Sequence, residues 1–493
     1  MALICEKAKE PMVGMERSLG LFGATMLIVG NVIGIGIFTT PGVIAEAIPN
    51  PIGIIALWIL GGILTLLGAL TYVEIGTALP YAGGEYVYLR EAYGPACGFL
   101  NGWTNFLVIN PGSIALMSVA AIVYVNQLLP VFSPERFVFR VSWSGIHIGL
   151  SYTQCAAIAI IVGFSALNCL GIRAGSMIQN VLTTVKIGAI AAIVLFGFAG
   201  GRGSLRHFVP ITEPKPSGNL LGTASLAMIC VFFSYTGWFT STYVAGEIRE
   251  PERNIRRSII YGTVIVTAIY VMVNAAYLYA MPPQRMRGLV NAGEAAAQIL
   301  LGSSAATCVS AAILVAILGA INSVILTAPR IYYAMAQDGL FFRAAGALHP
   351  RHKTPVNSIL LQAAWASLLV LMGTFNQLLT YTSVSMLAFS IMTAVGVFIL
   401  RKTRPEIRRP YLVPGYPWIP IIFIIAYALI LVYVIVSKPW ESLAGLGITA
   451  IGILWYQCWK SWARKGNAVQ NRSESNATCE VVAVVRHYAD DTR

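Results

Sequence analysis

Residues Gly30 to Phe38 read GNVIGIGIF, and this stretch interrupts what would otherwise be a continuous membrane-spanning helix. Apolar sequence long enough to cross a bilayer surrounds it, from residue 18 to residue 47. Closely spaced glycines are poor helix formers, so we expect the helix to break at Gly34-Ile35-Gly36. Backbone without helical hydrogen bonds is tolerated at membrane depth only where protein or a water-filled cavity surrounds it. The break therefore predicts a place where a small polar ligand meets bare N–H and C=O groups.

The composition places the whole chain in the lipid bilayer. Of its 493 residues, 57% are hydrophobic and 11% are charged, whereas a soluble domain has about 25% charged residues. The apolar segments are much longer than the strands of a membrane β-barrel, so the predicted fold class is all-α. We expect twelve spans, with approximate limits at 18–47, 52–79, 95–130, 147–170, 174–199, 219–247, 256–281, 303–335, 356–373, 376–400, 418–437 and 442–463.

The net charge of +13 is better explained by membrane orientation than by nucleic-acid binding. If the N-terminus is cytoplasmic, the short inner loops hold fifteen Arg and Lys residues and the outer loops hold eight. The positive-inside rule then places both termini in the cytoplasm. We expect a multi-pass protein of the plasma membrane, or of the cytoplasmic membrane in a prokaryote. The outer loops hold no pair of cysteines, so we expect no disulfide framework.

A second span is interrupted at Ser234-Tyr235-Thr236-Gly237, about 200 residues after the first break. Each break lies in the first span of a block of five. Two broken helices in matching positions are typical of transporters built from inverted repeats, whose binding site lies where the repeats meet. The predicted organisation is a cytoplasmic tail at 1–17, repeat one at about 18–199, repeat two at about 219–400, two further spans within 401–463 and a disordered tail at 464–493.

Several motifs in the same order resemble one known family. They are Gly30 to Phe38, TYVEIGTALPYAGGEYVYL (Thr71 to Leu89), FLVINPGS (Phe106 to Ser113), NCLGIRAGSMIQN (Asn168 to Asn180), Lys186, FFSYTGW (Phe232 to Trp238), VAGEIREPERNIRRSI (Val244 to Ile259) and RIYYAMAQDGLFF (Arg330 to Phe342). The sequence resembles the amino acid–polyamine–organocation (APC) superfamily, and most closely its L-type amino acid transporter branch. The resemblance implies a leucine-transporter-like fold of five plus five helices and secondary transport of amino acids.

Two departures from the family pattern alter what the resemblance implies. Eukaryotic L-type transporters carry a cysteine after the third span that bonds a heavy chain, but residues 131–145 contain none. We therefore expect no disulfide-linked partner. The serine at the centre of the family's first break is Ile35 here, which removes a hydroxyl group but keeps the backbone donors.

The two breaks offer both kinds of group that an amino acid requires. The second half of the first span would direct free N–H groups of Gly34, Ile35 and Gly36 at a carboxylate, aided by about half a positive charge. By resemblance, carbonyls at Val32, Phe233 and Thr236 hold the ammonium, and the Phe233 ring closes over the substrate. Carbonyls at Ser234 and Tyr235 are further candidates, and Tyr235 and Trp238 are candidate pocket walls. The competing interpretation of Gly30-x-x-x-Gly34 is helix packing.

Lys186 lies near the middle of the fifth span, without another charge between Arg173 and Arg202. An unpaired lysine at that depth is costly, so it should face the protein interior and have a partner. In sodium-coupled relatives a cation joins the first and eighth spans at this place, and the lysine resembles its replacement. We therefore expect sodium-independent transport, with Lys186 bonded to carbonyls of the first break. A fixed tether and a proton carrier remain open as its role.

Other polar residues are weaker candidates. Glu74 and Glu247 lie near the ends of their spans and are interpreted as gate or loop anchors rather than proton carriers. Asn322 and Ser323 could line a cavity, although hydrogen bonding between helices is commoner for such residues. The five histidines form no H-E-x-x-H motif, and there is no G-x-S-x-G or Walker A sequence. We therefore expect no enzyme activity, no metal and no cofactor.

The sequence thus predicts a secondary transporter that works by alternating access. Ile35, Phe233, Tyr235 and Trp238 suggest an apolar and aromatic pocket, and no carboxylate is evident at mid-membrane. This favours sodium-independent exchange of neutral L-amino acids. The alternatives are a proton-coupled symporter of cationic amino acids or polyamines and, less favoured, a transporter-like sensor. A channel would typically repeat its pore element between subunits, which two different breaks on one chain do not suggest.

Overall fold

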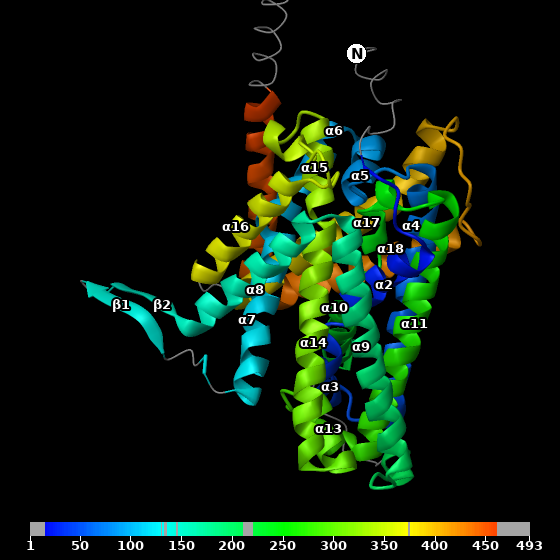
Figure 1. Cartoon of the computed structure of the whole chain (residues 1–493). Coiled ribbons are helices and arrows are strands. Elements are labelled where there is room, and N and C mark those ends of the chain that lie inside the picture. Colours follow the sequence, from blue (N-terminus) through cyan, green and yellow to red (C-terminus); the bar gives the residue numbers. More distant parts are fainter. Residues whose placement is uncertain are drawn as a thin grey trace, which may run out of the picture.

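The computed structural model describes residues 15–129, 131–132, 136–143, 146–210, 220–372 and 375–460, and these are almost entirely helical (Figure 1). The predicted tails at 1–17 and 464–493 therefore fall outside the described residues, except for residues 15–17. The first half of the chain forms α2 (Leu21–Val32), α3 (Gly36–Ala47), α4 (Pro51–Ala78), α5 (Glu85–Tyr93), α6 (Pro95–Thr104), the π-helical turn η2 (Asn105–Ile109), α7 (Asn110–Leu128), β1 (Phe137–Trp143), β2 (Ile146–Ser151), α8 (Tyr152–Cys169), α9 (Ile172–Ala199) and η3 (Leu205–Phe208).

The second half is also helical. It forms α10 (Leu220–Tyr235), η4 (Thr240–Thr242), η5 (Ala245–Glu247), α11 (Pro251–Ala280), α12 (Pro283–Met286), α13 (Ala292–Leu301), α14 (Ser303–Thr327), α15 (Pro329–Gln337), η6 (Arg343–Gly346), α16 (Val356–Met372), α17 (Phe375–Thr403), α18 (Trp418–Ser437) and a last helix, Pro439–Lys460. Among the described residues, nine helices are long and apolar enough to cross a membrane, and one bent pair would count as a tenth. Two shorter apolar helices, Leu226–Thr242 and Val356–Met372, fall below that length. The chain is therefore a multi-pass membrane protein, and the count of twelve spans stays a prediction.

The first predicted break is confirmed. Helix α2 ends at Val32, α3 begins at Gly36, and the two axes are bent by 43°. The residues between them include Gly34, where the absence of a side chain lowers helix propensity. Pro41 does not end α3, although its missing N–H removes the helical bond to the Ile37 carbonyl.

The second break is also present, although its two sides differ. Helix α10 ends at Tyr235, and the chain continues through turns into the short 3₁₀ helices η4 and η5. Gly237 has φ +104°, a backbone conformation that L residues rarely adopt. The segment after the break is therefore not a regular second half-helix.

The region before the fourth span differs from the prediction. Residues 137–151 form an antiparallel hairpin in which Phe137 pairs with Ser151 and Trp143 with Ile146. We predicted a loop at 131–145 and a helix from residue 147. The helix begins only at Tyr152, because the Ser151 hydroxyl accepts from the Gln154 N–H and the Ser151 N–H donates to the Gln154 side-chain oxygen.

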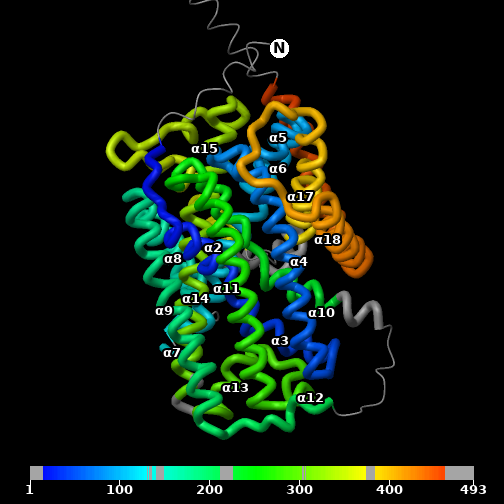
Figure 2. The backbone as a smooth tube through the Cα atoms, turned by 90° about the vertical axis from the view of Figure 1, so that its right-hand side faces the viewer, coloured from blue at the N-terminus to red at the C-terminus, as the bar shows by residue number. Residues whose placement is uncertain are grey.

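The packing places the two breaks in the middle of the molecule. Helix α11 packs along α4 and α2, α14 packs along α7 and α9, and α10 packs against α3. Figure 2 shows α12 and α13 at one end of the helices and α5, α6 and α15 at the other. We call the second of these ends the α5 end. The described part of the N-terminal segment begins there (Figure 2).

Candidate functional site

The first break leaves backbone donors unused. The N–H groups of Ile35, Gly36 and Ile37 have no acceptor among the residues that the structure describes. They lie at the N-terminus of α3, where the helix dipole contributes about half a positive charge. Such an end is suited to bind a carboxylate or another anion. The sequence predicted Gly34, Ile35 and Gly36 as donors, but the Gly34 N–H is occupied by the carbonyl of Val32 at 2.8 Å.

The two breaks touch each other through glycine. A Cβ atom on Gly36 would lie 2.7 Å from the Ser234 Oγ and 3.1 Å from its Cα, so only glycine allows this approach. Thr40 and Ser234 share a hydrogen bond of 3.2 Å beside the contact. On the other side, the Asn31 amide donates to the Thr240 hydroxyl at 2.6 Å. The two breaks are therefore in direct contact.

Tyr270 of α11 joins the breaks directly. Its hydroxyl lies 2.7 Å from the Val32 carbonyl and 2.8 Å from the Ser234 carbonyl. A tyrosine hydroxyl has a single proton, so it can fully satisfy only one of these two acceptors at a time. The other acceptor keeps capacity for a further donor such as an ammonium group.

Lys186 of α9 bonds the opposite face of the first break. Its Nζ donates to the carbonyls of Gly30 at 2.9 Å and Ile33 at 2.5 Å, and its side chain is buried. Both carbonyls would otherwise lack a helical partner, because α2 stops at Val32. Gly30 allows the close approach, since a Cβ there would lie 1.9 Å from the Gln179 amide nitrogen. The ammonium thus holds the end of α2 against α9.

A cavity of about 330 Å³ opens between the breaks and α7 and α14. No charged side chain belongs to its described lining, which mixes apolar groups with hydroxyls and amides. This volume is in the lower range of small-molecule pockets. The polar members of the lining are Asn31, Thr39, Asn110, Ser113, Ser234, Thr236, Thr240, Tyr243 and Thr327.

The structure brings most of the predicted residues to this cavity. The members present in the lining are Val32, Gly34, Ile35, Gly36, Phe233, Ser234 and Thr236. Tyr235 and Trp238 are not part of it. Tyr235 turns away and donates to the Trp58 carbonyl at 3.0 Å, and the Trp238 ring packs on Tyr72 at 4.7 Å between centroids. These two aromatic residues support the walls from behind.

The third span contributes a face of the cavity that the sequence did not predict. Asn110 and Ser113 lie in its lining, directly after the π-helical turn η2. Pro111 lacks an N–H group, so the Leu107 carbonyl loses its helical donor and accepts instead from the Trp365 indole at 2.8 Å. The polar sequence Asn110-Pro-Gly-Ser113 in an apolar span was the available signal. Asn322, by contrast, bonds Gln179 at 2.8 Å and serves helix packing.

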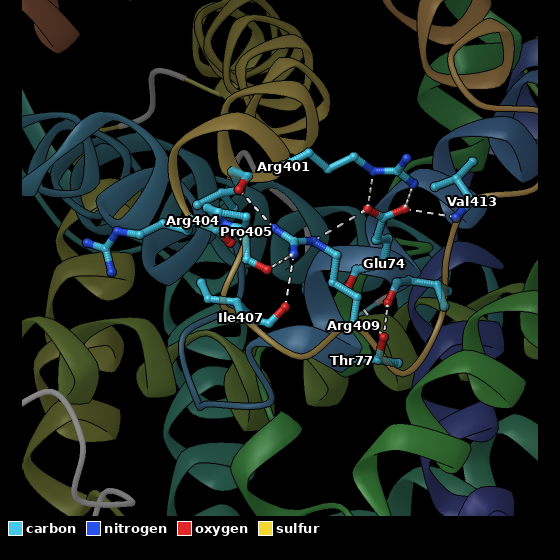
Figure 3. A network of polar contacts seen from close by, with 10 residues as sticks. Glu74, Thr77, Arg401, Arg404, Pro405, Ile407, Arg409 and Val413 are labelled. Atoms are coloured by element: carbon cyan, nitrogen blue, oxygen red, sulfur yellow. Dashed lines mark hydrogen bonds and ion pairs between the residues drawn. The ribbon is translucent and has the colours of Figure 1, made fainter.

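Two ion pairs lie toward the α5 end and join segments distant in sequence. Glu74 of α4 accepts from Arg401 at 2.7 and 2.6 Å and from the Val413 N–H at 2.8 Å (Figure 3). Arg409 donates to the carbonyls of Ile407 and Arg404 and so stiffens the same loop (Figure 3). Glu74 therefore anchors the loop that precedes α18. Glu74 is thus a loop anchor, which is one of the two roles interpreted from its position near the end of its span.

The second pair is more deeply buried. Arg330 of α15 donates to both oxygens of Glu247, at 2.8 and 3.1 Å, and their side chains are 0% and 1% exposed. The Glu247 carbonyl accepts from the N–H of Leu19 at 3.0 Å, just before α2. Glu247, which follows the second break, thus bonds both α15 and the segment that precedes α2.

Comparison with known proteins identifies the family to which the chain belongs. The sequence matches the amino acid permease family over residues 19–453. The chain belongs to that family, within the APC superfamily. The permease is 34% identical to the serine/threonine exchanger SteT of Bacillus subtilis (strain 168), over 83% of this chain and 89% of the relative.

Two mammalian relatives are similar over most of their length. The permease is 30% identical to the b(0,+)-type amino acid transporter 1 of Homo sapiens, over 91% of this chain and 89% of the relative. It is 30% identical to the large neutral amino acids transporter small subunit 2 of Mus musculus, over 92% and 83%. The resemblance to L-type transporters is therefore confirmed. The permease is an amino acid transporter and not an enzyme.

The Tyr270 contact gives a first testable prediction. Replacing Tyr270 with phenylalanine removes one hydroxyl from between the breaks and keeps the ring. A neutral hydrogen bond contributes about 0.5–1.5 kcal/mol, so the KM for transported amino acid should rise about 2- to 10-fold. The half-exposed Tyr261 of the same helix provides the control, and Tyr261→Phe should leave KM unchanged. An unchanged KM in Tyr270→Phe would show that the bridge does not position the substrate groups.

Proposed function

We propose that this permease exchanges neutral L-amino acids across the plasma membrane, without sodium, by alternating access. The observation that carries the substrate class is the uncharged described lining of the cavity between two breaks. A zwitterion requires one anion site and one cation site, and both are supplied by backbone groups. A cationic side chain would require an additional carboxylate, since an isolated charge is costly to desolvate.

In the proposed complex, the substrate carboxylate accepts from the N–H groups at the start of α3, those of Ile35 and Gly36 included. The ammonium donates to the carbonyls of Val32, Phe233 and Thr236, where Tyr270 yields part of its bond to Val32. The Phe233 ring covers the aliphatic part of the substrate. Ser234 and Gly34 shape the floor, and Tyr235 and Trp238 support it from outside the lining.

Lys186 supports sodium independence. Its ammonium already holds the carbonyls of Gly30 and Ile33, which is the kind of acceptor pair that a bound cation would otherwise use. The Lys186 side chain at the same place would remove the need for sodium to brace the break. Exchange is favoured because the relative SteT is named an exchanger. We keep facilitated transport and proton symport as distinct alternatives.

The proposal includes the membrane topology. Twelve spans in two inverted repeats, at about 18–199 and 219–400, place both termini and the α5 end in the cytoplasm. The ion pair between Glu247 and Arg330 then closes the cytoplasmic side. The bonds of Leu19 and Glu247 would have to open for substrate to leave inward.

Transport by purified protein in liposomes tests the function. We expect uptake of labelled serine, threonine and leucine that accelerates when the liposomes contain unlabelled substrate. Replacement of sodium by choline should leave the rate unchanged, and protein-free liposomes provide the background. Preferential uptake of arginine or putrescine would refute the substrate class. An uptake rate that does not depend on unlabelled substrate inside the liposomes would refute exchange.

A further inference from the structure

The carboxyl group of Glu85 is buried at the start of α5. Glu85 begins α5, its residue is 5% exposed, and it accepts a hydrogen bond of 2.5 Å from the Tyr72 hydroxyl. Within the part of the chain that the structure describes, no Lys, Arg or His forms an ion pair with it. A buried unpaired carboxylate is costly, so the group is either neutral or compensated by something it binds.

Three buried polar side chains in the neighbourhood of Glu85 have no hydrogen-bond partner among the described residues. The side-chain amide of Asn101, the hydroxyl of Tyr88 and the hydroxyl of Thr393 are buried and lack hydrogen bonds to described residues. Asn101 lies near the Glu85 carboxyl group, and Thr393 lies near Tyr72. Tyr88 lies near Thr242 and within the electrostatic range of Glu85. Buried polar atoms without partners are rare in folded proteins and typically mark water or an ion. The cluster therefore has unused donors and acceptors that can form hydrogen bonds with a small polar species.

Only the Tyr243 side chain separates the Glu85 cluster from the cavity between the breaks. Tyr243 belongs to the cavity lining and also lies beside Glu85. The N–H of Gly83 donates to the Tyr243 carbonyl at 3.0 Å, and a Cβ on Gly84 would lie 2.4 Å from the Tyr243 ring. The segment after the second break thus packs directly on the turn that presents Glu85. A change of charge at Glu85 would act on this contact.

The surroundings favour a proton over a metal ion. Burial raises the pKa of Glu85 to about 7, and the nearby polar side chains of Tyr72, Tyr243, Ser390 and Asn101 partly oppose the rise. Among the described residues, the titratable groups that face the cluster are tyrosines, which are neutral near pH 7. They are Tyr72 of α4, Tyr88 of α5, Tyr243 beside η4, Tyr332 of α15 and Tyr427 of α18. A single carboxylate among neutral oxygens is a poor site for a divalent cation.

We propose that Glu85 binds and releases one proton during the transport cycle, exchanging it with water held by Asn101, Tyr88 and Thr393. When the proton leaves to water, the resulting carboxylate accepts the Tyr72 hydrogen bond. When the proton returns, the carboxylic acid is neutral and contacts of the Tyr243 segment change. This inference rests on the transport function proposed above and adds a proton dependence to it.

Transport at different pH values tests the proposal. The exchange rate of the natural protein in liposomes should vary between about pH 5 and about pH 9, with a midpoint near pH 7. On the side of the midpoint where the active protonation state is the minor one, the rate should change roughly tenfold for each pH unit. Glu85→Gln cannot titrate, so its rate should vary less than about twofold over this range. Glu91→Gln is the matched control, because Glu91 lies on the same helix and pairs with Arg90 at 2.9 Å. Its profile should follow that of the natural protein.

A second variant keeps the test decisive if Glu85→Gln does not fold. The Tyr72 hydroxyl stabilises the charged carboxylate, so Tyr72→Phe should move the midpoint to higher pH. Infrared difference spectra between acidic and basic buffer should show a protonated carboxyl band that Glu85→Gln lacks, and this readout requires no substrate. Absence of neutral amino acid transport at every pH would refute the proposed function and leave the spectra to decide on the proton site.

Two outcomes would overturn the proton site. One is a Glu85→Gln profile with the natural midpoint together with an unchanged infrared band. The other is a Glu85 variant that loses a dependence on sodium or potassium instead of a dependence on pH, which would make the cluster a cation site.

Discussion

Lys186→Ala is expected to lower amino acid exchange in liposomes by at least about 100-fold. The ammonium bonds the carbonyls of Gly30 and Ile33, and each hydrogen bond that involves a charged group contributes about 1.5–3 kcal/mol. Loss of both leaves two buried acceptors unsatisfied at the end of α2. A change of about 3 kcal/mol in the free energy of the transport-competent break corresponds to about two orders of magnitude in rate.

The control is Lys402→Ala, since Lys402 is exposed at the end of α17 and its loss should not alter exchange. Lys186→Met retains the length of the side chain and removes its charge, so it should be as inactive as the alanine variant. Binding of labelled substrate to the detergent-solubilised protein separates loss of affinity from loss of movement. Normal transport by Lys186→Ala, with an unchanged pH profile, would refute both the tether and the proton carrier as roles of this residue.

The fold was predictable where single residues impose a strong local constraint. Glycines at 34 and 36 lie in a run otherwise apolar enough to cross the membrane, so the break near Gly34 followed from helix propensity alone. Lys186 was predictable for a similar reason, because a charge in mid-membrane requires a partner. Its acceptors at Gly30 and Ile33 are the free carbonyls that the break creates.

Side-chain directions near the second break were not predictable. Helical periodicity tells which face a residue occupies only while the helix continues, and α10 ends at Tyr235. Tyr235 and Trp238 were therefore expected in the pocket, whereas they pack behind it. Tyr270 was missed because one tyrosine in an apolar span gives no sign that its hydroxyl meets two carbonyls.

The third span and the β-hairpin were not predictable for a different reason. Asn110 follows a π-helical turn that shifts the face of the helix, and a regular helical repeat would place it elsewhere. Residues 137–143 belong to the stretch 131–145 after the third predicted span, which was interpreted as a loop. Their pairing with 146–151 depends on a partner strand that local sequence does not reveal.

The ion pair of Glu247 and Arg330 should be the most sensitive polar contact at the α5 end. Both side chains are almost fully buried, and removing one partner of a buried pair typically costs about 3–5 kcal/mol, since the other charge is left unpaired. Glu247→Gln and Arg330→Met should therefore each lower the thermal unfolding midpoint strongly. The double variant should be more stable than the sum of the two effects predicts, because no charge remains unpaired.

The pair of Glu74 and Arg401 provides the matched comparison, because the Arg401 side chain is 24% exposed. Arg401→Met should cost less than Arg330→Met, because Glu74 would keep the Val413 N–H at 2.8 Å and the Arg409 guanidinium at 3.9 Å. The same proteins should be tested for substrate efflux from the α5 side, where in the proposed mechanism the buried pair keeps the segments around Leu19 and Glu247 closed. In the double variant, the closed state loses its ion pair and retains its packing, so that side should open more often. Efflux that stays at the natural rate, together with additive losses of stability, would show that the pair neither couples nor gates these segments.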